Sequence, residues 1–198
     1  MNHRSLLPTF LALLLVGGAA ACAQQPAADP PLKGSSLGGP INLVNQDGQR
    51  VTDANLAGKY RLLYFGFANC PDVCPVDLAV LGAGLRQFEQ QDRARAERVQ
   101  PIFITVDPER DTPDVLKRYV ANFHPRLIGL TGTPAEIQQV STAFGASALK
   151  GETNAGGGYN VNHTRYILLM GPEGEPIAII PHDEGAGAVA EQLDRWIR

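Results

Sequence analysis

The sequence lacks several features that mark large classes of protein. Lysine and arginine total 17 against 20 acidic residues, and they form no basic cluster. Proteins that bind nucleic acid usually carry a cluster of basic residues, so this distribution argues against nucleic-acid binding. Only three cysteines and four histidines are present, so any site built from them uses few residues. A hydrophobic content of 44% and a length of 198 residues are typical of one globular domain with a sizeable core.

A long apolar run is also missing. The N-terminal run Leu6–Ala21 has 16 residues, whereas a membrane-spanning helix needs about 20. It follows the positively charged Met1–Arg4 segment and ends in small residues, so residues 1–21 are predicted to be a secretory signal peptide. We therefore expect an exported domain on the periplasmic side of the inner membrane.

The junction after this run resembles a bacterial lipobox. Ala19-Ala20-Ala21-Cys22 places a cysteine where lipid would be attached, although Ala19 stands where a larger aliphatic residue is usual. Lipidation of Cys22 is the preferred interpretation. Ordinary cleavage at an Ala-x-Ala site and an uncleaved anchor are the alternatives, and all three place the domain outside the cytoplasm. Residues 22–38, rich in Pro, Ala, Gly and Ser, are predicted to be a flexible tether.

Residues 39–198 show the pattern of an α/β domain. A short β-hairpin is expected over 41–51, and one helical turn over 52–56. Strands and helices then alternate, which implies parallel pairing, and a final hairpin adds antiparallel strands. The sequence predicts a mixed central sheet flanked by helices, and a strand–helix start with a cysteine pair is how thioredoxin-like folds begin. The expected strands are 60–67, 99–106, 127–130, 166–170 and 177–180; the expected helices are 75–92, 111–122, 133–144 and 186–197; and 147–162 is expected to be a loop.

Cys70 and Cys74 lie where the first core strand gives way to the first long helix. Each is followed by a proline, and Pro75 suits the first turn of a helix because its missing N–H would have no partner there. Both thiols are therefore expected at or just before a helix N-terminus. The positive end of the helix dipole is expected to stabilise a thiolate and lower its pKa.

This cysteine pair has a redox or metal-binding character. Two cysteines four positions apart close almost no loop, so their disulfide would constrain the unfolded chain little. Two thiolates suit Cu(I) or Zn²⁺, or they can join as a Cys70–Cys74 disulfide. An inert pair of small core residues is the ordinary alternative. The flanking prolines and the helix start weigh against it.

His163 is the second candidate for the site. It ends a glycine-rich loop just before the strand expected over 166–170. In a thioredoxin-like sheet that strand lies next to the first core strand, so its start approaches the cysteine loop. His124 and His182, each beside a proline, are predicted to be surface residues, and His3 belongs to the leader.

Three motifs resemble the SCO (SenC/PrrC-type) family over residues 38–198. They are FGFANCPDVCP at 65–75, ITVDPERDTP at 104–113 and NHTRYILLMGPEG at 162–174. That family comprises membrane-tethered copper proteins with a thioredoxin fold that help to assemble the copper centre of cytochrome c oxidase. The resemblance implies that Cys70, Cys74 and His163 bind copper, as Cu(I) or, with an added oxygen ligand, as Cu(II).

Two details bear on this resemblance. Many members of the family have Asp where this chain has Asn162, so a charge beside the histidine ligand is missing here, which is expected to shift copper affinity or redox preference. Asp107-Pro108 resembles the start of the family's DPxRDTP segment. An acidic cap and turn before the next helix explains these residues almost as well.

Three functions remain after these observations. The preferred one is a copper metallochaperone that delivers copper to the copper-containing subunit of cytochrome c oxidase, with other copper chaperones as further partners. The second is a thiol–disulfide oxidoreductase that reduces the cysteines of such a subunit, and the third is a peroxidase. Thioredoxin-type oxidoreductases use CxxC and a proline before the late strand, whereas this chain has CxxxC and Asn162-His163-Thr164. Peroxidases have Thr three residues before the reactive cysteine, where this chain has Pro71.

Overall fold

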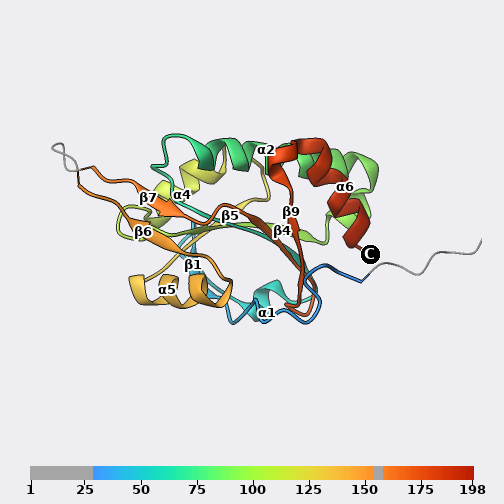
Figure 1. Cartoon of the computed structure of the whole chain (residues 1–198), viewed down its shortest axis with the longest axis horizontal. Coiled ribbons are helices and arrows are strands. Elements are labelled where there is room, and N and C mark those ends of the chain that lie inside the picture. Colours follow the sequence, from blue (N-terminus) through green and yellow to red (C-terminus); the bar gives the residue numbers. More distant parts are fainter. Residues whose placement is uncertain (1–28, 154–157) are drawn as a thin grey trace, which may run out of the picture.

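A computed structural model of the chain describes residues 29–153 and 158–198. The central feature is a seven-stranded sheet in the order β2-β1-β5-β4-β3-β8-β9, with helices on both faces (Figure 1). The strands are β1 Asn42–Asn45, β2 Arg50–Thr52, β3 Tyr60–Gly66, β4 Val99–Thr105, β5 Ile128–Thr131, β6 Ala148–Lys150, β7 Val161–His163, β8 Ile167–Met170 and β9 Pro176–Ile180. The helices are α1 Asp53–Leu56, α2 Val73–Gln91, α3 Arg93–Ala96, α4 Pro113–Val120, α5 Pro134–Ala143, the 3-10 helix η1 His182–Glu184 and α6 Ala186–Trp196.

The pairing confirms the predicted mixed sheet. Strands β3, β4 and β5 are parallel, as expected for strands that alternate with helices. The N-terminal hairpin β1–β2 and the late hairpin β8–β9 are antiparallel. Strand β8 pairs with β3, which confirms that the late strand lies next to the first core strand.

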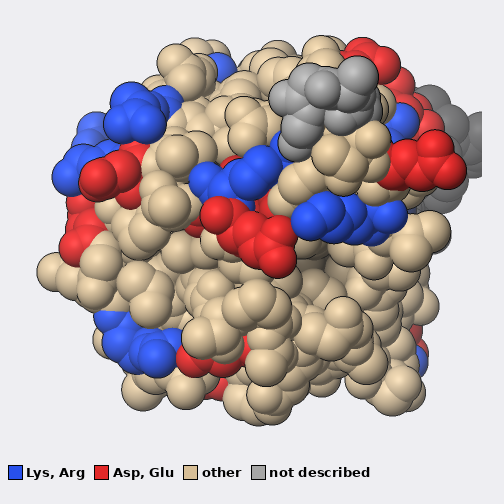
Figure 2. Space-filling view, turned by 90° about the vertical axis from the view of Figure 1, so that its left-hand side faces the viewer, with Lys and Arg blue, Asp and Glu red and all other residues tan. Residues whose placement is uncertain are grey.

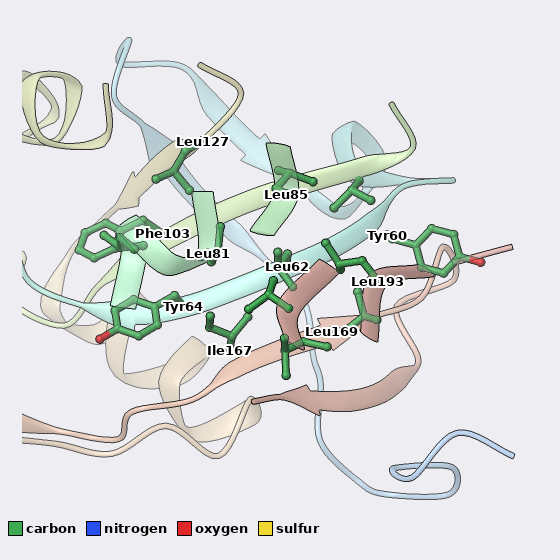
Figure 3. Packing of buried hydrophobic residues seen from close by; sticks show 14 of the residues in the cluster. Tyr60, Leu62, Tyr64, Leu81, Leu85, Phe103, Leu127, Ile167, Leu169 and Leu193 are labelled. Atoms are coloured by element: carbon green, nitrogen blue, oxygen red, sulfur yellow. The ribbon is translucent and has the colours of Figure 1, made fainter. Parts of the chain in front are cut away.

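Strand β3 occupies the middle of the core. All seven of its residues are buried, which explains its continuous apolar run. Leu62 and Tyr64 face the hydrophobic cluster beneath α2 and α6, and Figure 3 shows them among its side chains. Leu63 and Phe65 face the opposite cluster, on the side of α5. The strand therefore holds both helical layers together, and its C-terminal end leads directly into the cysteine loop.

The helices form two layers around this sheet. Helices α2, α4 and α6 cover one face, and α1 and α5 lie on the other (Figure 1). Helix α2 buries Leu78, Leu81 and Leu85 against the sheet, at the helical spacing seen in the sequence. The N-terminus of α5 has a capping box, because Thr133 caps the helix and Glu136 bonds back to it.

The expected loop over 147–162 is corrected by the structure. Its two ends form an antiparallel two-stranded sheet, with β6 paired to β7. Sequence patterning missed these strands because all three residues of β6 are exposed, so no buried face produces an alternation of apolar and polar residues. We call the segment from Ala148 to His163 the β6–β7 hairpin. It brings His163 to the end of a strand.

The start of the described chain lies against the domain. The Leu32 amide donates to the Ile177 carbonyl over 3.0 Å, and the Gly38 amide donates to the Ala143 carbonyl over 2.8 Å. Residues 29–38, the C-terminal part of the expected tether, thus contact the last strand and α5. The predicted signal peptide, Cys22 and the rest of the tether lie outside the described residues. Within residues 29–153 and 158–198, every helix is too short or too polar to cross a membrane.

Candidate metal centre

The cysteine loop connects the C-terminal end of β3 to α2. The Cys70 amide donates to the Phe67 carbonyl over 3.2 Å, which turns the chain, and the Cys74 amide donates to Cys70 Sγ over 3.4 Å. Cys70 is half-buried, whereas Cys74 is fully buried in the first turn of α2. A Cβ on Gly66 would lie 2.9 Å from Cys74 Sγ, so this position has no room for a side chain. The predicted strand–loop–helix arrangement of the pair is confirmed.

The third residue arrives from the β6–β7 hairpin. His163 Nε2 lies 3.2 Å from Cys74 Sγ, and the donor atoms of Cys70, Cys74 and His163 all lie within 4.8 Å of one another. His163 Nδ1 is 3.0 Å from the Thr164 carbonyl oxygen. Because a carbonyl only accepts, Nδ1 carries the proton and the Nε2 lone pair faces the cysteines. The structure therefore brings together the three residues that the sequence singled out.

Aromatic rings hold the imidazole in place. The His163 ring meets Tyr64 and Phe67 edge to face, with centroid distances of 6.3 and 5.8 Å. In front of the ring is a cleft of about 310 Å³. Its lining residues are Phe67, Cys70, Pro71, Asp72, Val73, Asn160, Val161, Asn162, His163 and Arg165. A partner can thus approach Cys70 and His163 from solvent while Cys74 stays at the bottom of the site.

The expected lowering of the thiol pKa is wrong for Cys74. Burial raises the pKa of Cys74 to about 12, and the neighbouring Cys70 thiol adds to the rise, against a smaller lowering by a hydrogen bond with the Phe67 backbone. The cost of placing a charge in the core outweighs the helix dipole here. Burial also lowers the pKa of His163, so its imidazole is neutral at pH 7 and available as a ligand.

A buried polar network behind the site was not predicted. Asp77 on α2 is 2% exposed and accepts hydrogen bonds from the Tyr64 hydroxyl at 2.8 Å and from Arg165 at 2.8 and 3.1 Å. His182 Nε2 lies 3.4 Å from the same carboxylate. This network ties the helix of Cys74 to the segment just after His163. A signal existed in the sequence, because an acidic residue stands beside Leu78 on the apolar face of α2.

The predicted surface positions of His124 and His182 are wrong. His124 is 2% exposed, beside Glu89 and Arg126, and the side chain of His182 is 10% exposed against Asp77. The acids that they face, Glu89 and Asp77, lie on α2, far away in sequence, so the flanking prolines gave no hint of burial. Neither histidine belongs to the cluster formed by Cys70, Cys74 and His163.

The donor set fits a soft metal ion. Bond lengths of about 2.0–2.3 Å, as in zinc sites, place three donors around one ion roughly 3.5–4 Å apart. The observed separations of up to 4.8 Å are close to this, so small side-chain movements complete the site. Two thiolates and one imidazole favour Cu(I). A structural zinc site would need a fourth ligand, and the cluster found in residues 29–153 and 158–198 has three.

Fold and site together define a class of protein. A thioredoxin-like α/β domain carries a cysteine–cysteine–histidine cluster that could hold a metal ion, where its first core strand meets its first long helix. The SCO1/SenC family model matches residues 29–198, and the chain belongs to this family. Among curated proteins, the mitochondrial SCO1 homolog 1 of Arabidopsis thaliana is 44% identical over 139 residues, which are 70% of this chain and 40% of that protein.

Solved relatives share the whole domain. The copper-bound structure of ScoI from Bradyrhizobium japonicum is 41% identical, with a TM-score of 0.73 over 81% of this chain and 99% of that one. The copper-bound structure of yeast Sco1 is 36% identical, with a TM-score of 0.74 over 82% of this chain and 88% of that one. This chain spans about half the length of the curated relatives that it matches. Several curated relatives are mitochondrial, and the solved relatives include bacterial proteins, such as those of Bradyrhizobium japonicum and Thermus thermophilus.

Proposed function

We propose that this protein is a copper metallochaperone that binds one copper ion through Cys70, Cys74 and His163. The observation that supports this most directly is the 3.2 Å approach of His163 Nε2 to Cys74 Sγ, with Nδ1 oriented by the Thr164 carbonyl. A histidine ligand typically has its second ring nitrogen fixed in this way. Copper bound in ScoI and in yeast Sco1 is consistent with the same cargo here.

The proposed delivery uses the difference between the two cysteines. Cys74 is buried and holds the metal from below, whereas Cys70 is half-buried at the mouth of the cleft. A cysteine or histidine of the acceptor can therefore replace Cys70 or His163 first, and Cys74 releases the ion last. The proposed acceptor is the copper-containing subunit of cytochrome c oxidase, and other copper chaperones are proposed donors. Membership in the SCO1/SenC family supports this choice.

The proposed location follows from the N-terminal sequence. We propose export by the signal peptide at residues 1–21 and attachment to the periplasmic side of the inner membrane through Cys22 or the N-terminal segment. Leu32, near the start of the described residues, donates its amide hydrogen to the Ile177 carbonyl of β9. Mass spectrometry of the mature N-terminus distinguishes lipid on Cys22 from simple cleavage.

A copper titration tests the ligand set. Reduced protein under anaerobic conditions is expected to bind one Cu(I) tightly, and His163→Ala is expected to weaken binding by about 10- to 100-fold, because one of three ligands is lost. Competition with a Cu(I) chelator measures the change. Gln139→Ala, an exposed truncation on α5, is the matched control and should bind like the parent. Equal affinity in His163→Ala and the parent would contradict the assignment of His163.

Copper affinity is expected to rise with pH. The pKa of Cys74 is about 12, so this thiol is protonated at neutral pH in the metal-free protein and loses its proton when copper binds. Each pH unit between 6.5 and 8.5 should then strengthen binding by at least about tenfold. The pKa of His163 is lowered, so its imidazole is already neutral in this range and adds little. An affinity that stays constant with pH, after correction for the chelator, would contradict the binding of a Cys74 thiolate.

One observation favours a second function, that of a thiol–disulfide oxidoreductase. Both cysteines are free, with Cys70 half-buried at the mouth of the cleft and Cys74 buried behind it. An accessible attacking thiol followed by a buried resolving thiol is a workable arrangement for disulfide exchange. Weak copper binding together with a Cys70–Cys74 disulfide that exchanges rapidly with a dithiol peptide would favour this function over copper delivery.

A further inference from the structure

The turn between β4 and α4 is built in a way that helix capping does not explain. Asp107 is 4% exposed and Asp111 is fully buried. Helix α4 is capped by Thr112, whose hydroxyl accepts from the Val115 amide at 3.4 Å. The carboxylates of Asp107 and Asp111 face other segments. They therefore have a role beyond the acidic cap that the sequence suggested.

One side of this turn holds the cysteine loop. Asp111 Oδ2 accepts from the Ala68 amide at 2.9 Å and from the Thr105 hydroxyl at 2.6 Å. Ala68 lies two residues before Cys70. In addition, the Val106 amide donates to the Gly66 carbonyl over 2.8 Å. The turn is thus fixed to the segment from which Cys70 projects.

The other side of the turn holds the β6–β7 hairpin, through Tyr159. The Tyr159 hydroxyl donates to Asp107 Oδ1 over 2.7 Å, and Arg110 Nη1 donates to the Tyr159 carbonyl over 3.0 Å. The Arg110 guanidinium also stacks on the Tyr159 ring at 3.6 Å from its centroid. Arg110 Cζ also lies 5.6 Å from the centroid of the Phe67 ring, and Phe67 in turn meets His163. Tyr159 lies four residues before His163.

Core packing holds only the β7 side of this hairpin, where Val161 is 7% exposed and belongs to the hydrophobic core and Tyr159 packs against it. All residues of β6 are exposed, and a cavity of about 220 Å³ lies next to Tyr159 and Val161, between the hairpin and α5. A further ion pair, Lys150 with Glu109 at 3.1 Å, joins the hairpin to the same turn. Figure 2 shows side chains of both signs next to each other on the face at this end of the molecule. Polar contacts with the 107–111 turn therefore do much to set the hairpin's position.

We infer that Arg110 and Asp107 are positioning residues for the metal centre: they hold Tyr159 and thereby set His163 against Cys74. This inference rests on the proposed function, because copper is the ligand whose binding they support. Loosening these contacts moves His163 away from the two cysteines and leaves the cysteines in place. The 107–111 turn thus controls how firmly the histidine ligand is held, and so how readily copper is released.

A double-mutant cycle tests this role. Arg110→Gln is expected to weaken Cu(I) binding by about tenfold, as for residues that orient a ligand. The same change in the His163→Ala background is expected to have no further effect, because there is no histidine left to position. Tyr159→Phe removes only the hydroxyl and should give a smaller loss. Arg118→Gln, which removes the same charge from an exposed position on α4, is the control.

A second measurement needs no metal. Cys74 is fully buried next to His163, so displacement of the histidine should expose its sulfur. Alkylation of Cys74 in the reduced, metal-free protein, followed by peptide mass spectrometry, is expected to be about tenfold faster in Arg110→Gln and unchanged in Arg118→Gln. Unchanged labelling, or a loss of affinity that persists in the His163→Ala background, would overturn the inference. Faster labelling in a protein that binds no copper would keep the positioning role and refute the proposed function.

Discussion

Replacing Cys74 with alanine is expected to weaken copper binding by at least about a thousandfold, the largest functional effect of any single change in this chain. Cys74 Sγ lies 3.2 Å from His163 Nε2 at the bottom of the site, where water cannot replace it as a ligand. Cys70→Ala is expected to act in the same direction. Chelator competition under anaerobic conditions measures both affinities.

The control for this substitution must account for its burial. Cys74 is fully buried, so its truncation also leaves a small cavity that costs about 1 kcal/mol of stability. Ser141→Ala removes one buried atom from α5, on the other face of the sheet, and should leave copper affinity unchanged. Circular dichroism confirms that each variant is folded. Copper affinity in Cys74→Ala equal to that of Ser141→Ala would remove Cys74 from the ligand set.

Oxidation of the two cysteines to a disulfide is expected to prevent copper binding. Both cysteines are free thiols in the structure, and the Cys70–Cys74 disulfide stays a prediction. Because copper needs both sulfurs as thiolates, a disulfide between them would compete with the metal for the same atoms.

The sequence predicted the parts of the fold that depend on local patterns. The apolar run of β3 and the prolines after the cysteines each act over a few residues, and each gave the correct element. His163 could be placed because β8 had to pair with β3 in a sheet of this kind. Thus the three candidate ligands followed from residue type and from the order of the strands.

Features that depend on distant partners could not be predicted in this way. Burial of His124 depends on Glu89, which comes from α2, 35 residues earlier in the chain. The pKa of Cys74 depends on how deeply α2 sits against β3, which no local pattern reports. The DPERDTP motif was visible, but the direction of its carboxylates, toward Ala68 and Tyr159, follows from tertiary structure alone.

The largest effect on stability is expected from Asp77→Ala, which should lower the free energy of unfolding by about 3 kcal/mol. Asp77 is 2% exposed and accepts from the Tyr64 hydroxyl and from two nitrogens of Arg165. Without the carboxylate, the fully buried Tyr64 hydroxyl loses its partner, and the Arg165 guanidinium loses the charge that it faces. Urea denaturation measures the change, and Tm should fall by about 6–12 °C.

Two further variants separate this network from general effects of charge. Asp77→Asn keeps an acceptor for the Tyr64 hydroxyl but removes the charge facing Arg165, so about half of the loss is expected. Glu191→Ala removes an exposed acid from α6 and should change stability by less than about 0.5 kcal/mol. Because Arg165 lies two residues after His163, Asp77→Ala should also lower copper affinity, whereas Glu191→Ala should not. If Asp77→Ala were no less stable than Glu191→Ala, the network would not contribute to the fold, and the link from α2 to the histidine segment would have to be sought in packing alone.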